Sequence, residues 1–172
     1  VSFHLTAVIP ILLFFLIKKF KKLKLKYFIF LFFLGVIISY LGYGLKNVSP
    51  FLVEYLEGDK RMIYFEDRET RYILGFRGSF VFFNTFFLLL FLYFNKRWGA
   101  EVYTSLLKYY CLASFLFFMA FQIPYSDRIG LFSWYAIPLL FAPLWREDVR
   151  IPKSILVSFL ITVFIFFTFY FN

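Results

Sequence analysis

The sequence has almost none of the residues that form disulfides or bind transition metals. Cys111 is its one cysteine and His4 its one histidine. A single cysteine forms no internal disulfide, and zinc sites are built from several cysteines and histidines. An Asp-x-Asp pair is also missing. The sequence therefore excludes an internal disulfide framework and predicts no metal site and no cofactor.

Charged residues are scarce too, at 17%, whereas 62% of the residues are hydrophobic and 27% are aromatic. Soluble domains are about 45–50% apolar, so this composition predicts an integral membrane protein. The net charge of +9 does not indicate a nucleic-acid partner. Most lysines and arginines lie in short loops between apolar runs, which favours the lipid bilayer as the partner.

Six apolar segments divide the chain. A helix that spans a bilayer needs about 17–25 residues, including its interfacial ends. The segments are residues 1–17, 27–45, 80–94, 103–121, 129–144 and 155–171. We therefore predict an all-α, polytopic membrane protein of about six helices. Residues 1–172 form a single transmembrane domain with one long outer loop, residues 46–79.

Several positions modify these segments. Pro138 and Pro143 predict a kink or a break in segment 129–144, because proline removes a backbone donor. Segment 80–94 is short and carries Asn84. The glycines of segment 27–45 predict close approach of neighbouring helices. They are Gly35, Gly42 and Gly44.

The loops fall into two alternating sets. The more basic set, with 12 positive residues, comprises Lys18, Lys19, Lys21, Lys22, Lys24, Lys26, Lys96, Arg97, Lys108, Arg146, Arg150 and Lys153. The other, with seven, comprises Lys46, Lys60, Arg61, Arg68, Arg71, Arg77 and Arg128. Short cytoplasmic loops carry an excess of Lys and Arg. We therefore expect the more basic set in the cytoplasm and the other set on the outer face.

This orientation also places Val1 outside. The first apolar segment begins at that residue, with no initiator methionine and no signal-peptide pattern before it. We therefore expect the chain to be the C-terminal part of a longer protein.

The outer loop, residues 46–79, mixes charged and apolar residues. Ser49 and Pro50 predict the start of a short amphipathic helix that ends at Gly58 and lies on the membrane surface. A solvated loop would explain its balance of acids and bases. Its many apolar residues favour a loop that folds back onto the membrane domain and brings Arg77 to the membrane rim.

A second outer corner, residues 124–134, places Asp127 beside Arg128. Ser126 and Asp127 have the character of a helix N-cap, so Arg128 lies at a helix start, where the potential is already positive. One interpretation is a bound anion at this corner. The other is a local Asp127–Arg128 pair or a cap.

Two arginines, Arg77 and Arg128, therefore lie on the same predicted face. Arginine suits phosphate because its planar fork donates two parallel hydrogen bonds. Nearby aromatic side chains could stack on sugars or form an interfacial belt, which we favour for Trp134 and Tyr135. These aromatic residues are Tyr72, Phe76, Tyr125, Phe132 and Trp134.

The order of these motifs resembles the C-terminal half of EpsG-type proteins, which belong with the Wzy-like polymerases of O-antigen, capsule and exopolysaccharide. The resemblance covers roughly residues 40–144. It rests on Gly75-Phe76-Arg77, a hydrophobic span, a basic turn, a Tyr-rich span ending near Phe121, Ser126-Asp127-Arg128-Ile129, and Ser133-Trp134 before a Pro-containing helix.

The resemblance implies a bacterial inner-membrane enzyme that joins undecaprenyl-diphosphate-linked oligosaccharide repeats on the outer face. It implies Arg77 and Arg128 as catalytic residues, with Asp127 beside them. Arg71, Tyr72, Tyr125 and Trp134 become candidate substrate-binding residues. Asp127, Asp67 and Glu69 are the candidate general bases, and other polysaccharide-assembly proteins are candidate partners. The family pattern also implies further spans before Val1.

Two other functions stay open. A transporter or flippase subunit for a lipid-linked anionic glycan would use the same arginines only to bind. The short basic turns on the predicted cytoplasmic face weigh against it. A non-catalytic partner in a polysaccharide-assembly complex would have no active site.

Overall fold

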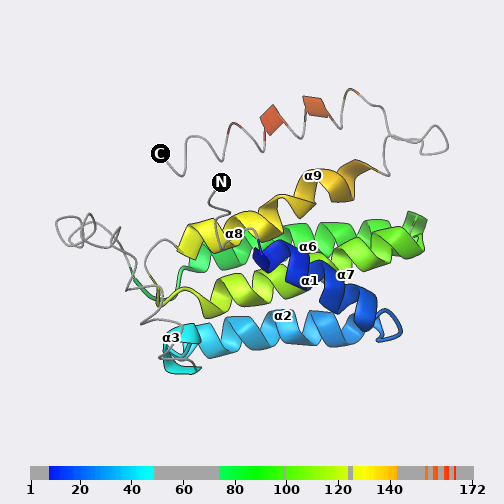
Figure 1. The fold of residues 1–172 in the computed structure, drawn as a ribbon. Coiled ribbons are helices and arrows are strands. Elements are labelled where there is room, and N and C mark those ends of the chain that lie inside the picture. Colours follow the sequence, from blue (N-terminus) through cyan, green and yellow to red (C-terminus); the bar gives the residue numbers. More distant parts are fainter. Residues whose placement is uncertain are drawn as a thin grey trace, which may run out of the picture. The chain divides into compact units, whose positions relative to one another are not determined.

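The computed structural model describes residues 8–48, 74–98, 100–123 and 126–142, with positions 154, 157, 158, 161, 162 and 165. In these ranges the secondary structure is helical, without strands (Figure 1). The predicted amphipathic helix, Asp67, Glu69, Arg71, Tyr72 and Tyr125 lie outside the described residues, as do His4, Arg146, Arg150 and Lys153.

The chain divides into two units, Val1–Leu140 and Phe141–Asn172. The described positions of the second unit beyond residue 142 are helical and exposed. The helices of the first unit, including the start of α9, which ends just beyond it, are α1 (Val8–Lys19), α2 (Leu25–Tyr40), α3 (Leu45–Val48), α6 (Gly78–Trp98), α7 (Glu101–Met119), α8 (Ser126–Trp134) and α9 (Ala136–Phe141).

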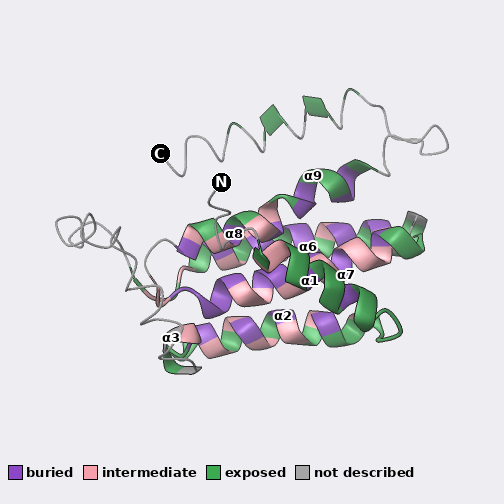
Figure 2. Ribbon diagram, viewed as in Figure 1, coloured by how far each residue is buried: buried purple, intermediate pink, exposed green. Residues whose placement is uncertain are grey.

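Helix α7 is the central helix of the first unit. It packs against α2, α8, α1 and α6, and more than half of its residues are buried (Figure 2). The buried residues include Tyr110 and Phe117, which are fully enclosed. The core therefore lies around α7, and the other helices expose apolar side chains on their outer sides.

Two of the described helices are long and apolar enough to cross a membrane, over Gly78–Arg97 and Glu101–Met119. Helix α2 is apolar but shorter, with 16 residues. This all-helical architecture agrees with the membrane protein expected from composition. The six spans stay a prediction.

The basic turn predicted directly after segment 80–94, at Asn95-Lys96-Arg97-Trp98, is wrong, because these residues form the last turn of α6. No proline or glycine interrupts the helix before Gly99. Lys96 and Arg97 also complement the negative end of the helix dipole. Segment 80–94 is therefore not a short span but part of a helix of 21 residues.

The predicted end of segment 27–45 is also too late, because α2 stops at Tyr40. Gly42 has a φ of 79°. The Gly42 amide donates to Ser39 O at 3.0 Å and the Tyr43 amide to Ile38 O at 3.1 Å. This pair of bonds is a Schellman motif, which ends a helix at a glycine with positive φ. Gly42 is thus a capping residue and not a site of helix approach.

Gly35 and Gly44 do serve close approach, as predicted. A β-carbon added at Gly35 would lie 2.8 Å from Phe115 Cδ2 on α7. One added at Gly44 would lie 2.5 Å from Met119 O. Helix α2 and the turn after it therefore pack directly on α7.

The kink predicted from Pro138 is confirmed. The helix that begins at Ser126 is interrupted at Tyr135, between α8 and α9. Pro138 has no amide hydrogen to donate to the Trp134 carbonyl four residues earlier, which explains the position of the break.

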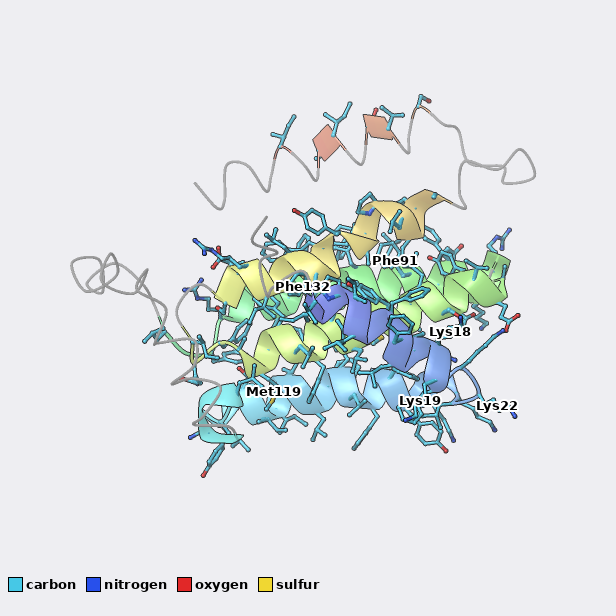
Figure 3. All side chains as sticks on the ribbon, in the orientation of Figure 1. Lys18, Lys19, Lys22, Phe91, Met119 and Phe132 are labelled. Carbon is cyan, nitrogen blue, oxygen red and sulfur yellow. The ribbon has the colours of Figure 1, made fainter. Side chains whose placement is uncertain are left out.

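The two ends of the first unit carry different loops. At one end, Lys21 Nζ lies 2.7 Å from Glu101 Oε1, and Lys108 Nζ donates to Lys21 O at 2.9 Å. At the other end, the Gly75 amide donates to Phe121 O at 2.9 Å. Figure 3 shows Lys18, Lys19 and Lys22 at the first end and Met119 at the second. Loops predicted to share a face therefore share an end in this unit.

Candidate functional site

The two arginines singled out in the sequence lie at the same end of the first unit. Arg77 directly precedes α6, and Arg128 is the third residue of α8. Because α7 runs antiparallel to both helices, α6 and α8 begin at the same end (Figure 1). We call this the arginine end, and the opposite one, with the loop at residues 20–24, the basic end.

Arg77 is half-buried, and its Cζ atom lies 5.4 Å from the centre of the Phe80 ring. This cation–π contact holds the guanidinium over the first turn of α6. Arg128 is exposed, whereas Asp127 beside it is half-buried. An exposed guanidinium at a helix start is accessible to an anion from outside the bundle.

Trp134 lies among aromatic rings of the helix bundle. The centre of its ring is 5.6 Å from those of Phe80 and Phe117 and 6.2 Å from that of Phe83. Phe80 therefore contacts both Arg77 and Trp134, and it links the start of α6 to the end of α8. The sugar-stacking role and the interfacial-belt role of Trp134 both stay predictions.

A buried polar network joins three helices below the arginine end. Asn84 on α6 is fully buried. Its Oδ1 accepts from Tyr110 OH at 3.3 Å, Ser114 Oγ at 3.3 Å and Ser133 Oγ at 3.2 Å. Its Nδ2 donates to Phe80 O at 2.9 Å. Tyr110 OH also donates to Asn84 O at 2.8 Å.

This network fixes α8 against α6 and α7, because a buried polar group in an apolar environment is costly to leave without a hydrogen-bond partner. Asn84 stood out in the sequence as a polar residue within an apolar segment. The roles of Tyr110, Ser114 and Ser133 were missed. The sequence feature that could have indicated these roles is the presence of hydroxyl groups in the two apolar segments after that of Asn84, residues 103–121 and 129–144.

Lys108 is a second buried polar residue that sequence reasoning placed only among the loop charges. It is 6% exposed. Its Nζ lies 5.7 Å from the centre of the Phe28 ring, in addition to its bond to Lys21 O. It therefore ties the loop at the basic end to α7. The sequence feature that could have indicated this burial is a lysine two turns inside an apolar helix.

A comparison with known protein families covers the whole chain, including the two arginines and the buried network. A family model described as the EpsG family matches residues 1–172. The chain belongs to the EpsG family. This is a family of Wzy-like polysaccharide polymerases. No curated protein and no solved structure matches the chain.

The EpsG match confirms the resemblance inferred from residues 40–144 and extends it to both ends of the chain. It therefore includes the arginine end, the basic end and the buried network. Among the described residues of this EpsG-family chain, no group of three or more His, Cys, Asp or Glu side chains is placed to hold a metal ion.

Proposed function

We propose that this chain polymerises undecaprenyl-diphosphate-linked oligosaccharide repeats by glycosyl transfer, with the arginine end as its active face. The observation that carries the proposal is the placement of Arg77 and Arg128 at one end of the first unit in a chain of the EpsG family. Arg71, Tyr72, Tyr125 and Trp134 are proposed to contact the substrate.

The reaction needs charge stabilisation at the departing group. A sugar hydroxyl of one lipid-linked repeat attacks the anomeric carbon of another. The new glycosidic bond forms as the bond from that carbon to the lipid diphosphate breaks. The diphosphate leaves with the electron pair, so negative charge grows on the bridging oxygen. Guanidinium groups held near this oxygen lower the barrier without a metal ion.

The attacking hydroxyl must also lose its proton. Asp127 is next to Arg128 in the first turn of α8. A carboxylate there can accept the proton as a general base or orient the guanidinium beside it. Asp67 and Glu69 are the other proposed bases.

The arginine end is proposed to face the outside of the bacterial inner membrane in a multi-pass arrangement. Support comes from the distribution of positive residues between the two ends. Six lysines lie within residues 18–26 at the basic end. Short loops with such an excess favour the cytoplasmic side.

The proposal is tested at Arg128, which is exposed and at the helix start. Both Arg128→Lys and Arg128→Ala should abolish long polymer in cells at normal membrane levels of the protein. Lysine keeps the charge but loses the planar two-pronged geometry. Lipid-linked single repeats should accumulate on the outer leaflet. Arg97→Lys, at the basic end, is the matched control and should leave chain length unchanged.

Three outcomes would contradict the proposal. Repeats that accumulate on the cytoplasmic leaflet would indicate a flippase. Recovery of long polymer in the double variant Asp127→Ala, Arg128→Ala would indicate a local ion pair, because removing both partners then restores what one change removes. Normal polymer in all of these variants would favour a non-catalytic partner.

A further inference from the structure

The backbone around Arg77 is anchored on both sides. The Gly75 amide, two residues before it, donates to Phe121 O at 2.9 Å, and the Val81 amide donates to Arg77 O at 3.2 Å. Gly75 has a φ of 106°, a conformation that glycine adopts without a steric penalty. The backbone of Arg77 therefore lies fixed between the end of α7 and the first turn of α6.

The neighbouring Phe76 adds a contact to a further helix. The centre of its ring lies 5.3 Å from that of Tyr40 at the end of α2 and 6.3 Å from that of Phe121. Phe121 is fully buried, so this anchor is part of the core. With the backbone held in this way, the direction of the Arg77 side chain is what decides where its guanidinium lies.

The Phe80 ring sets that direction. Arg77 directly precedes α6, where the helix dipole makes the potential positive and disfavours a cation. Its Cζ atom lies 5.4 Å from the centre of the Phe80 ring, and the negative face of an aromatic ring attracts a guanidinium. A ring orients a cation without cancelling its charge, and that charge is what a departing diphosphate needs.

Other aromatic rings hold the Phe80 ring in place. Phe80 is only 3% exposed. The centre of its ring lies 5.4 Å from that of Phe117 on α7 and 5.6 Å from that of Trp134 at the end of α8. Three helices therefore fix the ring, and the ring in turn fixes the guanidinium of Arg77.

We propose that Phe80 is a positioning residue for the polymerisation, which orients Arg77 through the electrostatics of its ring and not through packing alone. The inference rests on the proposed function, because that function assigns Arg77 to the departing diphosphate. Stacking engages the flat face of a guanidinium, whereas the N–H groups that bind phosphate lie in its plane. The ring and a diphosphate can therefore hold the same guanidinium together.

Fluorinated phenylalanines at Phe80 test this role, because fluorine withdraws electrons from the ring and changes its shape little. The full-length protein in bilayer discs receives lipid-linked repeats purified from cells that make no long polymer. The maximal rate should fall with each added fluorine, and a trifluorinated ring should lower it by about threefold to tenfold. The KM and the melting temperature should stay unchanged, since the contact acts on charge that develops in the transition state.

Phe87 is the matched control position. It lies on the same helix seven residues after Phe80, is 1% exposed, and its ring centre is 4.7 Å from that of Phe83. A trifluorinated ring there perturbs buried ring contacts of the same kind and should leave the maximal rate unchanged. Cyclohexylalanine at Phe80 fills the space without a π-system and should lower the rate at least as much as the trifluorinated ring.

Two results would overturn the inference. The first is an unchanged rate for every fluorinated ring at Phe80. The second is a fall in rate that is matched at Phe87 or that follows a loss of melting temperature, because either would indicate a packing role alone.

Failure of this inference differs from failure of the proposed function. If Arg77→Ala abolishes long polymer while fluorination of Phe80 has no effect, the positioning role is wrong and the function stands. If Arg77→Ala makes long polymer at the normal rate, the proposed function is wrong at Arg77, and the inference falls with it.

Discussion

The Ser133 hydroxyl on α8 donates to the side-chain oxygen of Asn84 on α6 at 3.2 Å, although 49 residues separate them in sequence. The same hydroxyl lies 2.8 Å from Gly130 O in its own helix. Arg128 is five residues before Ser133, and Arg77 is seven before Asn84. The contact therefore fixes the helix that carries one arginine against the helix that follows the other.

Asn84→Leu should reduce the free energy of unfolding by about 1–2 kcal/mol, because interhelical hydrogen bonds in membranes contribute about 0.6 kcal/mol each and at most about 1.7. Leucine has the same branched arrangement of side-chain heavy atoms but accepts no hydrogen bond. Three hydroxyl groups lose a shared acceptor. Equilibrium unfolding in mixed detergent micelles measures the change.

Ser105→Ala is the control for this prediction. Ser105 Oγ donates at 3.0 Å to Glu101 O in its own helix and is exposed. Its loss should change stability by less than about 0.5 kcal/mol. Equal effects of the two substitutions would contradict a special role for the network.

Gly130→Ala should destabilise the protein by about 1–3 kcal/mol, the usual effect of overpacking. A β-carbon there would lie 2.9 Å from Phe117 Cζ and 3.1 Å from Trp134 Cζ2. Phe117 is fully buried and cannot move aside cheaply. Thermal unfolding of the purified protein in detergent measures the loss.

Gly78→Ala provides the matched glycine control. An added β-carbon at Gly78 meets only Phe76 Cε1 at the ordinary distance of 3.8 Å. This substitution should be neutral or slightly stabilising, since alanine favours a helix over glycine. A stable Gly130→Ala protein would show that α8 can move away from α7.

Topology is tested with cysteines at two positions. Lys22→Cys should resist a membrane-impermeant thiol reagent in intact cells, whereas Asp59→Cys should react. Cys111 is fully buried and needs no removal. Permeabilised cells, in which Lys22→Cys should become reactive, are the control. The opposite pattern would reverse the orientation and move the arginine end to the cytoplasm.

Lys108→Met should expose the loop at the basic end to trypsin. Methionine keeps the apolar stem of the side chain but loses the donor to Lys21 O, which lies 2.9 Å from Nζ. Loss of about 1 kcal/mol of local stability corresponds to about fivefold faster cleavage after Lys21 and Lys22. Lys96→Met, an exposed residue near the end of α6, should leave the rate unchanged. Equal rates would mean that Lys108 does not hold the loop.

The long apolar runs predicted helices well because burial and length are properties of the segment itself. Helix α7 lies within two residues of segment 103–121 at both ends. The Pro138 break was also predictable, since a missing amide acts within its own turn. The ends of α2 and α6 were not. Gly42 capped one helix and nothing stopped the other before Gly99.

The candidate site was predictable only in part. Charge counting grouped Arg77 with Arg128 correctly at one end of the unit. It could not indicate that Asn84, Tyr110 and Ser133 meet, because this depends on how three helices rotate about their axes. Lys108 was counted among the loop charges for the same reason, because the sequence does not indicate which way its side chain points.

The network around Asn84 has a consequence for biosynthesis. Asn84 enters the membrane with its own helix, and its Nδ2 already has a partner there, the Phe80 carbonyl. Its side-chain oxygen accepts a hydrogen bond from Tyr110, which is synthesised 26 residues later. At a synthesis rate of about 5–20 residues per second this takes about 1–5 s. The side-chain oxygen of Asn84 on α6 therefore lacks its hydrogen-bond donor until α7 has been synthesised. A pause in translation between the two helices would prolong the exposure of this oxygen to lipid.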